Sequence, residues 1–232
     1  MKVQKQSLAD QVKDVLLERI IKGRYKPGDR LVELSIAKEL EVSQAPVREA
    51  FQRLEAMRFV ESRPNRGTFV REMPDREIGE STIVRGVLEE AAARKAANVL
   101  KGRIDELRTE VKGMTEGLAN GDFDTVAKHN VNFHRMIVHA SDNLVLIDAW
   151  ESLAFEAKSR LCAQRAAHAV MIKGVKSCEP IVEAFARGDG ETAGRLLRLQ
   201  TEDCGIAQAT ASVRVTPEEL KKALAAAGVQ KA

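Results

Sequence analysis

The sequence predicts a mainly α fold in two parts, a winged helix-turn-helix at the N-terminus followed by an antiparallel α-helical bundle. Three observations support this fold class. Residues 33–54 have the apolar spacing of two short helices joined by a tight turn. A short hairpin pattern with a glycine near its tip follows at 59–71. From residue 76 onward the chain shows helical periodicity, short breaks and almost no strand signal.

The helix pair at 33–54 is predicted from its apolar residues. The first helix, at 34–40, carries three of them at helical spacing: Leu34, Ala37 and Leu40. The second, from Gln44 to about Met57, repeats them on one face: Val47, Ala50, Phe51 and Leu54. Ser43 is a suitable N-cap, because its hydroxyl can accept a hydrogen bond from a free amide of the next helix. In a helix-turn-helix this second helix enters the major groove of DNA.

A basic hairpin after the second helix favours the winged form of this motif. Two short β-type segments, 59–62 and 68–71, flank the turn RPNRG at 63–67. Gly67 lets the backbone approach a duplex closely, while Arg63 and Arg66 supply positive charge for phosphate or the minor groove. An ordinary αα-corner has the same helix pattern but no hairpin, so the hairpin favours a DNA reader.

The remaining elements are predicted from caps and breaks. The N-terminal part also contains a helix at 7–21, a turn at 26–29 and a short strand at 30–32. Six bundle helices are expected, at 78–100, 104–119, 122–140, 144–172, 175–187 and 191–208, and the long fourth one is either straight or kinked. We divide the chain into a DNA-binding domain at 1–73, an all-α domain at 74–212, and a tail helix at 213–232. The tail helix packs on the bundle, joins a dimer contact or frays.

Composition and charge restrict the function classes. Up to Arg76 the chain has 16 Lys and Arg against 12 Asp and Glu, and afterwards 21 against 22, so the basic excess lies where attraction to phosphate requires it. No segment has the features of a membrane span or a secretory signal. The three cysteines lack CxxC spacing and suit reduced thiols in the cytoplasm. No nucleotide-binding or hydrolase motif occurs, so we expect no enzyme.

Several segments are similar to a known family of regulators. The DNA-binding part resembles the winged helix-turn-helix of GntR-family transcription regulators through PGDRL, PVREA and RPNRGTFV. The bundle resembles the FCD ligand-binding domain of the FadR subfamily through VRGVLEEAAARKAA, NFHRMIVHASDN and VEAFARGDGETAGRLL. Together the two matches cover roughly residues 8–208. The resemblance implies a homodimeric repressor that binds double-stranded operator DNA and responds to a small carboxylate-type effector.

The resemblance also implies which residues contact DNA. It assigns operator contacts to the start of the second helix and to the wing tip: Ser43, Gln44, Ala45, Arg48, Arg66 and Gly67. Arg53 is a further candidate for a phosphate contact. Relatives often have Arg at the position of Gln44, and Arg or Glu at that of Leu34, so the operator sequence cannot be borrowed from them. Arg58 stands where a helix-ending glycine is usual, at a cost of about 1 kcal/mol if this residue is left-handed.

The effector site departs further from the family pattern. Many FCD domains hold a divalent metal with one Asp and three His, and the matching positions here are Asn130, His134, Cys178 and Gln200. Only His134 keeps its type, so we expect a polar pocket without a metal cofactor that hydrogen-bonds the effector directly. A degenerate metal site formed by His134 and Cys178 is the alternative. Arg85 matches a position that binds a carboxylate, although an internal ion pair is equally compatible.

The three histidines of segment 122–140 do not form a metal triad by themselves. His129, His134 and His139 are five residues apart, which is about 140° around a helix at each step. We therefore expect them on different faces of one helix.

Overall fold

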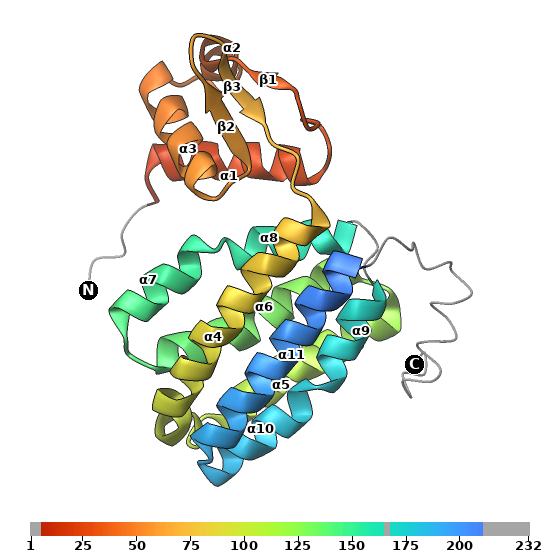
Figure 1. The fold of residues 1–232 in the computed structure, drawn as a ribbon. Helices are drawn as coiled ribbons and strands as arrows, with labels where there is room; N and C mark the ends of the chain where they lie inside the picture. Colours follow the sequence, from red (N-terminus) through yellow and green to blue (C-terminus); the bar gives the residue numbers. More distant parts are fainter. Residues whose placement is uncertain (1–5, 165–167, 211–232) are drawn as a thin grey trace. The chain divides into compact units, whose positions relative to one another are not determined.

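The computed structural model describes residues 6–164 and 168–210, so the predicted tail helix at 213–232 lies outside the described residues. The chain divides into two compact units, Met1–Met73 and Pro74–Ala232, and each is described here by itself. Both confirm the predicted fold class, with a small three-stranded sheet in the first unit and helices in the second (Figure 1).

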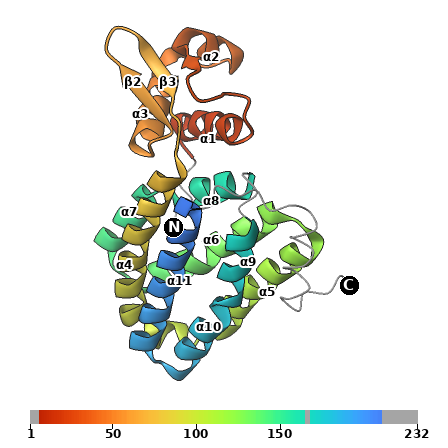
Figure 2. The same ribbon diagram turned by 45° about the vertical axis from the view of Figure 1, so that its right-hand side comes forward.

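The N-terminal unit is a winged helix-turn-helix. Its elements are α1 (Leu8–Ile21), β1 (Arg30–Leu31), α2 (Glu33–Glu39), α3 (Gln44–Ala56), β2 (Val60–Arg63) and β3 (Gly67–Val70). The antiparallel sheet has the strand order β1-β3-β2, and its hairpin register pairs Arg63 with Gly67. Figure 2 shows this hairpin extending beyond the three helices of the unit.

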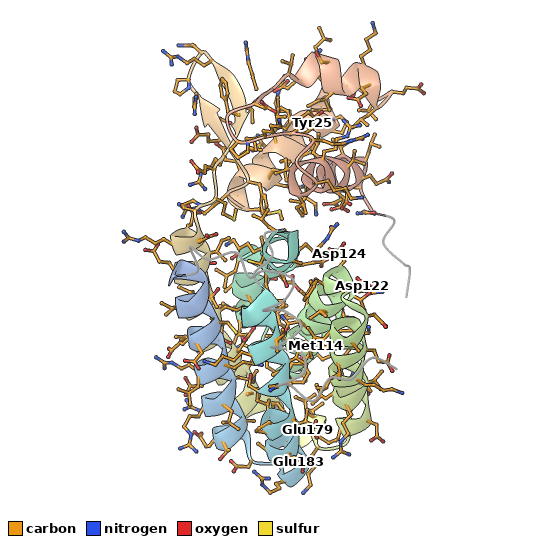
Figure 3. All side chains as sticks on the ribbon, turned by 90° about the vertical axis from the view of Figure 1, so that its right-hand side faces the viewer. Tyr25, Met114, Asp122, Asp124, Glu179 and Glu183 are labelled. Carbon is orange, nitrogen blue, oxygen red and sulfur yellow. The ribbon has the colours of Figure 1, made fainter. Side chains whose placement is uncertain are left out.

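Caps and apolar packing explain these elements. Ser7 caps α1 as predicted, since its hydroxyl oxygen accepts a hydrogen bond from the backbone N–H of Asp10 at 3.1 Å. Helix α1 packs against α3, and Leu16, Val47 and Leu54 are completely buried. Outside this core, Arg19 donates a hydrogen bond to the hydroxyl of Tyr25, labelled in Figure 3, and pairs with Glu39 of α2. The pair with Glu39 ties α2 to α1.

Of the three apolar residues that predict α2, Leu34 does not face the core. Its side chain is 64% exposed, and Ile36 and Ala37 form the buried side of α2 instead. The helix begins at Glu33 and has only seven residues, so few positions are available to face the core. Leu34 therefore lies on the surface of the first turn.

The C-terminal unit is the predicted helical bundle. Its elements are α4 (Asp75–Leu100), α5 (Ile104–Asn120), α6 (Phe123–Ala140), α7 (Leu144–Ser152), α8 (Phe155–Gln164), α9 (His168–Lys176), α10 (Cys178–Arg187) and α11 (Gly190–Thr210). Asp122 and Met114, both labelled in Figure 3, illustrate a cap and the core. The Asp122 carboxylate accepts from the Thr125 N–H at the start of α6, and Met114 is fully buried. No helix in the described ranges is long and apolar enough to cross a membrane.

The structure corrects two helix predictions in the bundle. The segment 144–172 is not one helix, because Ala154 takes a left-handed φ of 53° and separates α7 from α8, and α9 follows as a further helix. The segment 175–187 is also interrupted, since α9 ends at Lys176 and α10 begins at Cys178. Pro180 accounts for this second break, because it has no N–H for the Lys176 carbonyl and its ring crowds that carbonyl.

Helices α4 and α11 form the closest pair of the bundle and lie side by side in Figures 1 and 2. Small residues allow this approach: a Cβ at Gly190 would lie 2.9 Å from the Cβ of Ala97, and one at Gly194 would lie 2.8 Å from the Glu90 carbonyl oxygen. Ala93 and Ala96 are fully buried in the same core. This contact fixes the two helices that supply Arg85, Glu89 and Gln200.

Candidate functional site

The predicted reading surface lies at the start of α3. Ser43, Gln44, Ala45 and Arg48 are exposed there, while Val47 is completely buried and anchors the helix to the core. Ser43 is the N-cap residue as predicted, but its hydroxyl makes no capping hydrogen bond, so that part of the prediction is wrong.

Arg48 is held by an acidic residue of the neighbouring helix. Its Nε donates to Glu33 Oε1 at 3.3 Å and its Nη2 donates to Glu33 Oε2 at 2.9 Å. The Arg48 side chain is nevertheless 62% exposed. Glu33 is the first residue of α2, so the ion pair connects the two helices of the motif at their exposed ends.

Arg53 is engaged inside the unit. Its guanidinium donates hydrogen bonds to the Ser7 hydroxyl and to the Asp10 carboxylate at the start of α1. Hydrogen bonds from Ser7 and Arg53 lower the pKa of Asp10 below its usual value. Arg53 therefore links α3 to α1. Arg48 has a different partner, Glu33 of α2, so the structure does not bring the two arginines together.

The wing tip combines a left-handed glycine with two arginines. Gly67 has φ of +96°, and a Cβ there would lie 3.1 Å from Nε of Arg30, so glycine leaves room for the Arg30 side chain. Arg66 is exposed at the tip, whereas Arg63 lies over the Phe69 ring at 4.4 Å. Arg30 was not among the predicted contacts. Its position in β1, which pairs with β3 of the wing, is the signal that could have identified it.

The second candidate site is a cavity of about 80 Å³ within the bundle. Four of the predicted effector residues line it: Arg85, Asn130, His134 and Gln200. Other side chains contribute a further cation, three hydroxyls and two thiols: Lys158, Ser81, Thr82, Ser159, Cys162 and Cys204. Arg85 and Lys158 are each only 7% exposed, so the cavity wall contains two largely buried cationic side chains.

A buried carboxylate that the sequence prediction missed organises one side of this cavity. Glu89 is fully buried; its Oε1 accepts from Trp150 Nε1 at 2.9 Å and lies 3.2 Å from Arg85 Nε. Its Oε2 lies 3.0 Å from His134 Nδ1 and 3.1 Å from the Thr201 hydroxyl. The cluster thereby joins α4, α6, α7 and α11. Burial raises the pKa of Glu89, but His134 and Arg85 outweigh it and lower the pKa to about 2.

The contacts of Arg85 and His134 with Glu89 have ion-pair distances without good hydrogen-bond directions. Arg85 Nε and His134 Nδ1 are both buried without a hydrogen-bond partner of acceptable geometry. The Arg85 guanidinium also lies over the Phe155 ring, 3.7 Å from its centre. The internal ion pair that the sequence left open for Arg85 is therefore present, and the same side chain lines the cavity.

Gln200 and Cys178 form a second polar group beside the cavity. Gln200 Nε2 donates to the Gly174 carbonyl at 2.7 Å and contacts Cys178 Sγ at 3.3 Å, whereas Gln200 Oε1 is buried without a partner. Cys178 does not line the cavity; it is fully buried, and its thiol donates to the Gly174 carbonyl. Burial raises the pKa of this thiol to about 12.

These donors do not fit the metal site that is common in FCD domains. A metal-binding cysteine must be a thiolate, and the raised pKa of Cys178 opposes that state. His134 turns Nδ1 toward Glu89, Asn130 has no charge, and an amide such as Gln200 is a poor ligand for Zn²⁺. Within the described ranges, no three His, Cys, Asp or Glu side chains are grouped so that they could hold a metal ion.

The other two histidines of α6 have separate partners. His129 Nδ1 lies 2.8 Å from Glu110 of α5, and His139 Nε2 lies 3.3 Å from Glu151 of α7. They therefore do not join His134 at the cavity.

Comparison with known proteins agrees with both units. Residues 8–70 match the family described as bacterial regulatory proteins of the gntR family, and residues 80–201 match the FCD domain. The "Probable D-xylose utilization operon transcriptional repressor" of Paenarthrobacter nicotinovorans is 36% identical over 191 residues, which cover 82% of this chain and 84% of that protein. The gluconate operon transcriptional repressor of Bacillus licheniformis is 29% identical over 139 residues, covering 58% and 56% of the two chains.

Solved structures lead to the same family. The structure of a GntR transcriptional regulator from Rhodococcus sp. RHA1 has a TM-score of 0.70 and 30% sequence identity, and the alignment covers 90% of this chain and all of that one. Members of this family are DNA-binding transcription regulators and not enzymes. The chain therefore belongs to the GntR family of bacterial transcription regulators and carries a C-terminal FCD domain.

Proposed function

We propose that the protein is a repressor whose operator binding is modulated by a small organic acid held in the bundle cavity. The observation that carries this proposal is the cavity wall itself, in which Arg85 and Lys158 are largely buried cationic side chains. Buried cations favour an anionic partner, because they have lost most of their hydration.

The polar groups around the cavity further restrict the acid. Arg85 is a fork donor that suits a carboxylate, and its Nε lacks a well-directed hydrogen bond. The partnerless Oε1 of Gln200 is an acceptor that a ligand hydroxyl can satisfy. A hydroxylated acid matches this combination better than a simple fatty acid does. A metal ion is not needed in this binding mode.

The names of two relatives favour the same class of ligand. They describe repressors of D-xylose utilization and gluconate operons, which concern sugars and sugar acids. We therefore place D-gluconate, D-xylonate and lactate in a thermal-shift panel beside acetate and hexanoate, each with and without added Zn²⁺.

The panel has a defined outcome. At least one hydroxy acid is expected to raise the melting temperature of the wild-type protein, and the shift is expected to be lost in Arg85→Gln but kept in Arg103→Gln, an exposed arginine of the bundle. A shift that requires Zn²⁺ would support the metal-dependent alternative at His134 and Cys178. No shift with any acid would contradict the proposal.

The operator contacts are proposed at the exposed start of α3 and at the wing: Ser43, Gln44, Ala45, Arg48, Arg66 and Gly67, with Arg53 as a phosphate contact. The DNA upstream of the protein's own gene is the natural first probe in a gel-shift assay at low salt. Arg48→Ala is expected to weaken binding about 5- to 150-fold, because a bidentate arginine contact contributes about 1–3 kcal/mol. Arg103→Ala is the matched control and should bind DNA like the wild type.

We also propose that the protein acts as a homodimer, as a two-fold operator requires. Three exposed apolar side chains within about one turn of α4 support a covered surface, since Ile83, Val84 and Val87 are 44%, 51% and 46% exposed. An effector bound in each bundle then acts only through different affinities for the DNA-bound and free arrangements of the dimer.

A further inference from the structure

The ion pair between Glu33 and Arg48 leaves one edge of the guanidinium open. Glu33 occupies Nε and Nη2, at 3.3 and 2.9 Å, which is the side edge of the planar group. Five N–H donors surround a guanidinium in fixed directions. The N–H groups of Nη1, and the second N–H of Nη2, therefore point away from Glu33.

This open edge has the shape of a DNA-reading fork. Two parallel N–H donors from Nη1 and Nη2 match the O6 and N7 acceptors of guanine, or two oxygens of one phosphate. The Glu33 carboxylate on the side edge restricts rotation of the guanidinium and leaves the Nη1/Nη2 edge open. The exposure of the Arg48 side chain, 62%, keeps this edge accessible.

The position of Glu33 makes it a rigid support. It lies in the first turn of α2, and its side chain is 30% exposed, about half the exposure of Arg48. An unsupported arginine loses rotamer entropy when it is fixed in a contact. An arginine that is already held in the free protein loses less on binding, and this is the usual advantage of preorganisation.

We propose that Glu33 is a positioning residue for operator recognition, which holds Arg48 so that its Nη1/Nη2 edge faces the DNA. This inference rests on the proposed contact between Arg48 and the operator. It opposes the simpler electrostatic expectation that an acidic residue beside the reading helix only repels phosphate. Repulsion of that kind weakens operator and random DNA alike, whereas positioning acts on the operator alone.

The test is the ratio of dissociation constants for random and operator duplexes, measured by fluorescence anisotropy with the full-length protein. Four proteins form a double-mutant cycle: wild type, Glu33→Gln, Arg48→Ala and the double variant. Glu33→Gln keeps the side-chain shape and removes the charge. The pair Arg103 and Glu106 has the same two-bond geometry, at 2.7 and 2.6 Å, on the bundle, so Glu106→Gln is the matched control.

Glu33→Gln is expected to lower the ratio about fivefold in the Arg48 background and to change nothing in the Arg48→Ala background. Glu106→Gln should leave the ratio at its wild-type value. An unchanged ratio in Glu33→Gln, a higher one, or an effect that persists without Arg48 would overturn the positioning role. If Arg48→Ala itself leaves the ratio unchanged, the proposed contact of Arg48 fails first, so the two failures are distinguishable.

The acceptor that Arg48 binds is identified in the same assay. Replacing single guanines of the operator by 7-deazaguanine removes N7, and a loss confined to proteins with Arg48 identifies a guanine contact. If no guanine responds, the slope of log binding constant against log salt concentration is compared between the wild type and Arg48→Ala. A slope that is smaller by about one in Arg48→Ala identifies a phosphate contact. Only the guanine result agrees with Glu33 as the residue that aims the fork, because a phosphate contact strengthens binding to operator and random DNA alike.

Discussion

At the scale of single residues, the main feature that the sequence analysis missed is the buried carboxylate of Glu89. Glu89 is a fully buried carboxylate in an apolar bundle, and Arg85, His134 and Trp150 contact it from three helices. The sequence contains a hint of the pair, because Arg85 and Glu89 are four residues apart on one helix. The roles of His134 and Trp150 depend on tertiary packing, which no local pattern records.

The lowered pKa of Glu89 predicts how stability depends on pH. The pKa is about 2 in the folded protein against 4.5 as the ordinary value, so the carboxylate stabilises the fold above pH 4.5 and this contribution is lost as the pH falls toward 2. The free energy of unfolding is expected to fall by on the order of 3 kcal/mol in total, because each unit of pKa difference contributes about 1.4 kcal/mol. Urea unfolding of the wild type and Glu89→Gln between pH 3 and pH 7 measures it. Parallel profiles for the two proteins would rule out this role of Glu89.

Arg58 provides a prediction of the opposite sign. It has φ of 66°, in the left-handed region, directly after α3, where glycine is the favoured residue. Arg58→Gly is therefore expected to raise the free energy of unfolding by about 0.5–1 kcal/mol. Arg58→Ala keeps the unfavourable Cβ and serves as the control. Equal unfolding midpoints for the glycine and alanine variants would contradict the argument.

Helices and strands were predictable where their boundaries are marked by local signals. Helix α1 begins after Ser7, and α5 ends at the left-handed Gly121, each within a residue of the predicted position. The segment after Leu144 was less predictable, because Ala154 has no intrinsic preference for the left-handed conformation that ends α7 there. The break before α10 could have been predicted from Pro180, because proline is common in the first turn of a helix and rare in its interior.

The close packing of α4 against α11 predicts a specific sensitivity to size. In Gly194→Ala the added Cβ would lie 2.8 Å from the Glu90 carbonyl oxygen, which belongs to the backbone and cannot move away alone. The expected cost is about 1–3 kcal/mol, despite the better helix propensity of alanine. At Gly102 a new Cβ meets only one atom, at 3.6 Å, so Gly102→Ala is the control. Equal melting temperatures for the two variants would refute the packing argument.

At the scale of the molecule, the sequence predicts both units and four of the residues that line the cavity. The resemblance placed Arg85, Asn130, His134 and Gln200 together, because the matches lie on α4, α6 and α11 of a recognisable bundle. It could not place Lys158, since α8 lies in the segment that was predicted as one long helix. It also could not show that Cys178 faces Gln200 and the Gly174 carbonyl instead of the cavity.

The homodimer proposal has a direct test at this scale. Sedimentation of the full-length protein is expected to give twice the chain mass of 25.6 kDa. Val84→Glu places a charge on the exposed apolar surface of α4 and is expected to shift the protein toward monomer. Leu199→Glu changes an exposed leucine on α11 as a control. A monomeric wild type at micromolar concentration would contradict the proposal.

The most direct test of the central claim measures operator affinity with and without the best acid from the thermal-shift panel, in wild type and in Ser159→Asp. Ser159 lines the cavity, so a carboxylate there should repel an anionic effector while leaving the DNA-binding unit untouched. Ser152→Asp, exposed at the end of α7, is the matched control. The acid is expected to weaken operator binding at least fivefold in wild type and Ser152→Asp, whereas Ser159→Asp is expected to bind the operator normally and not to respond to the acid. An equal response in Ser159→Asp, or no response in the wild type, would contradict the account.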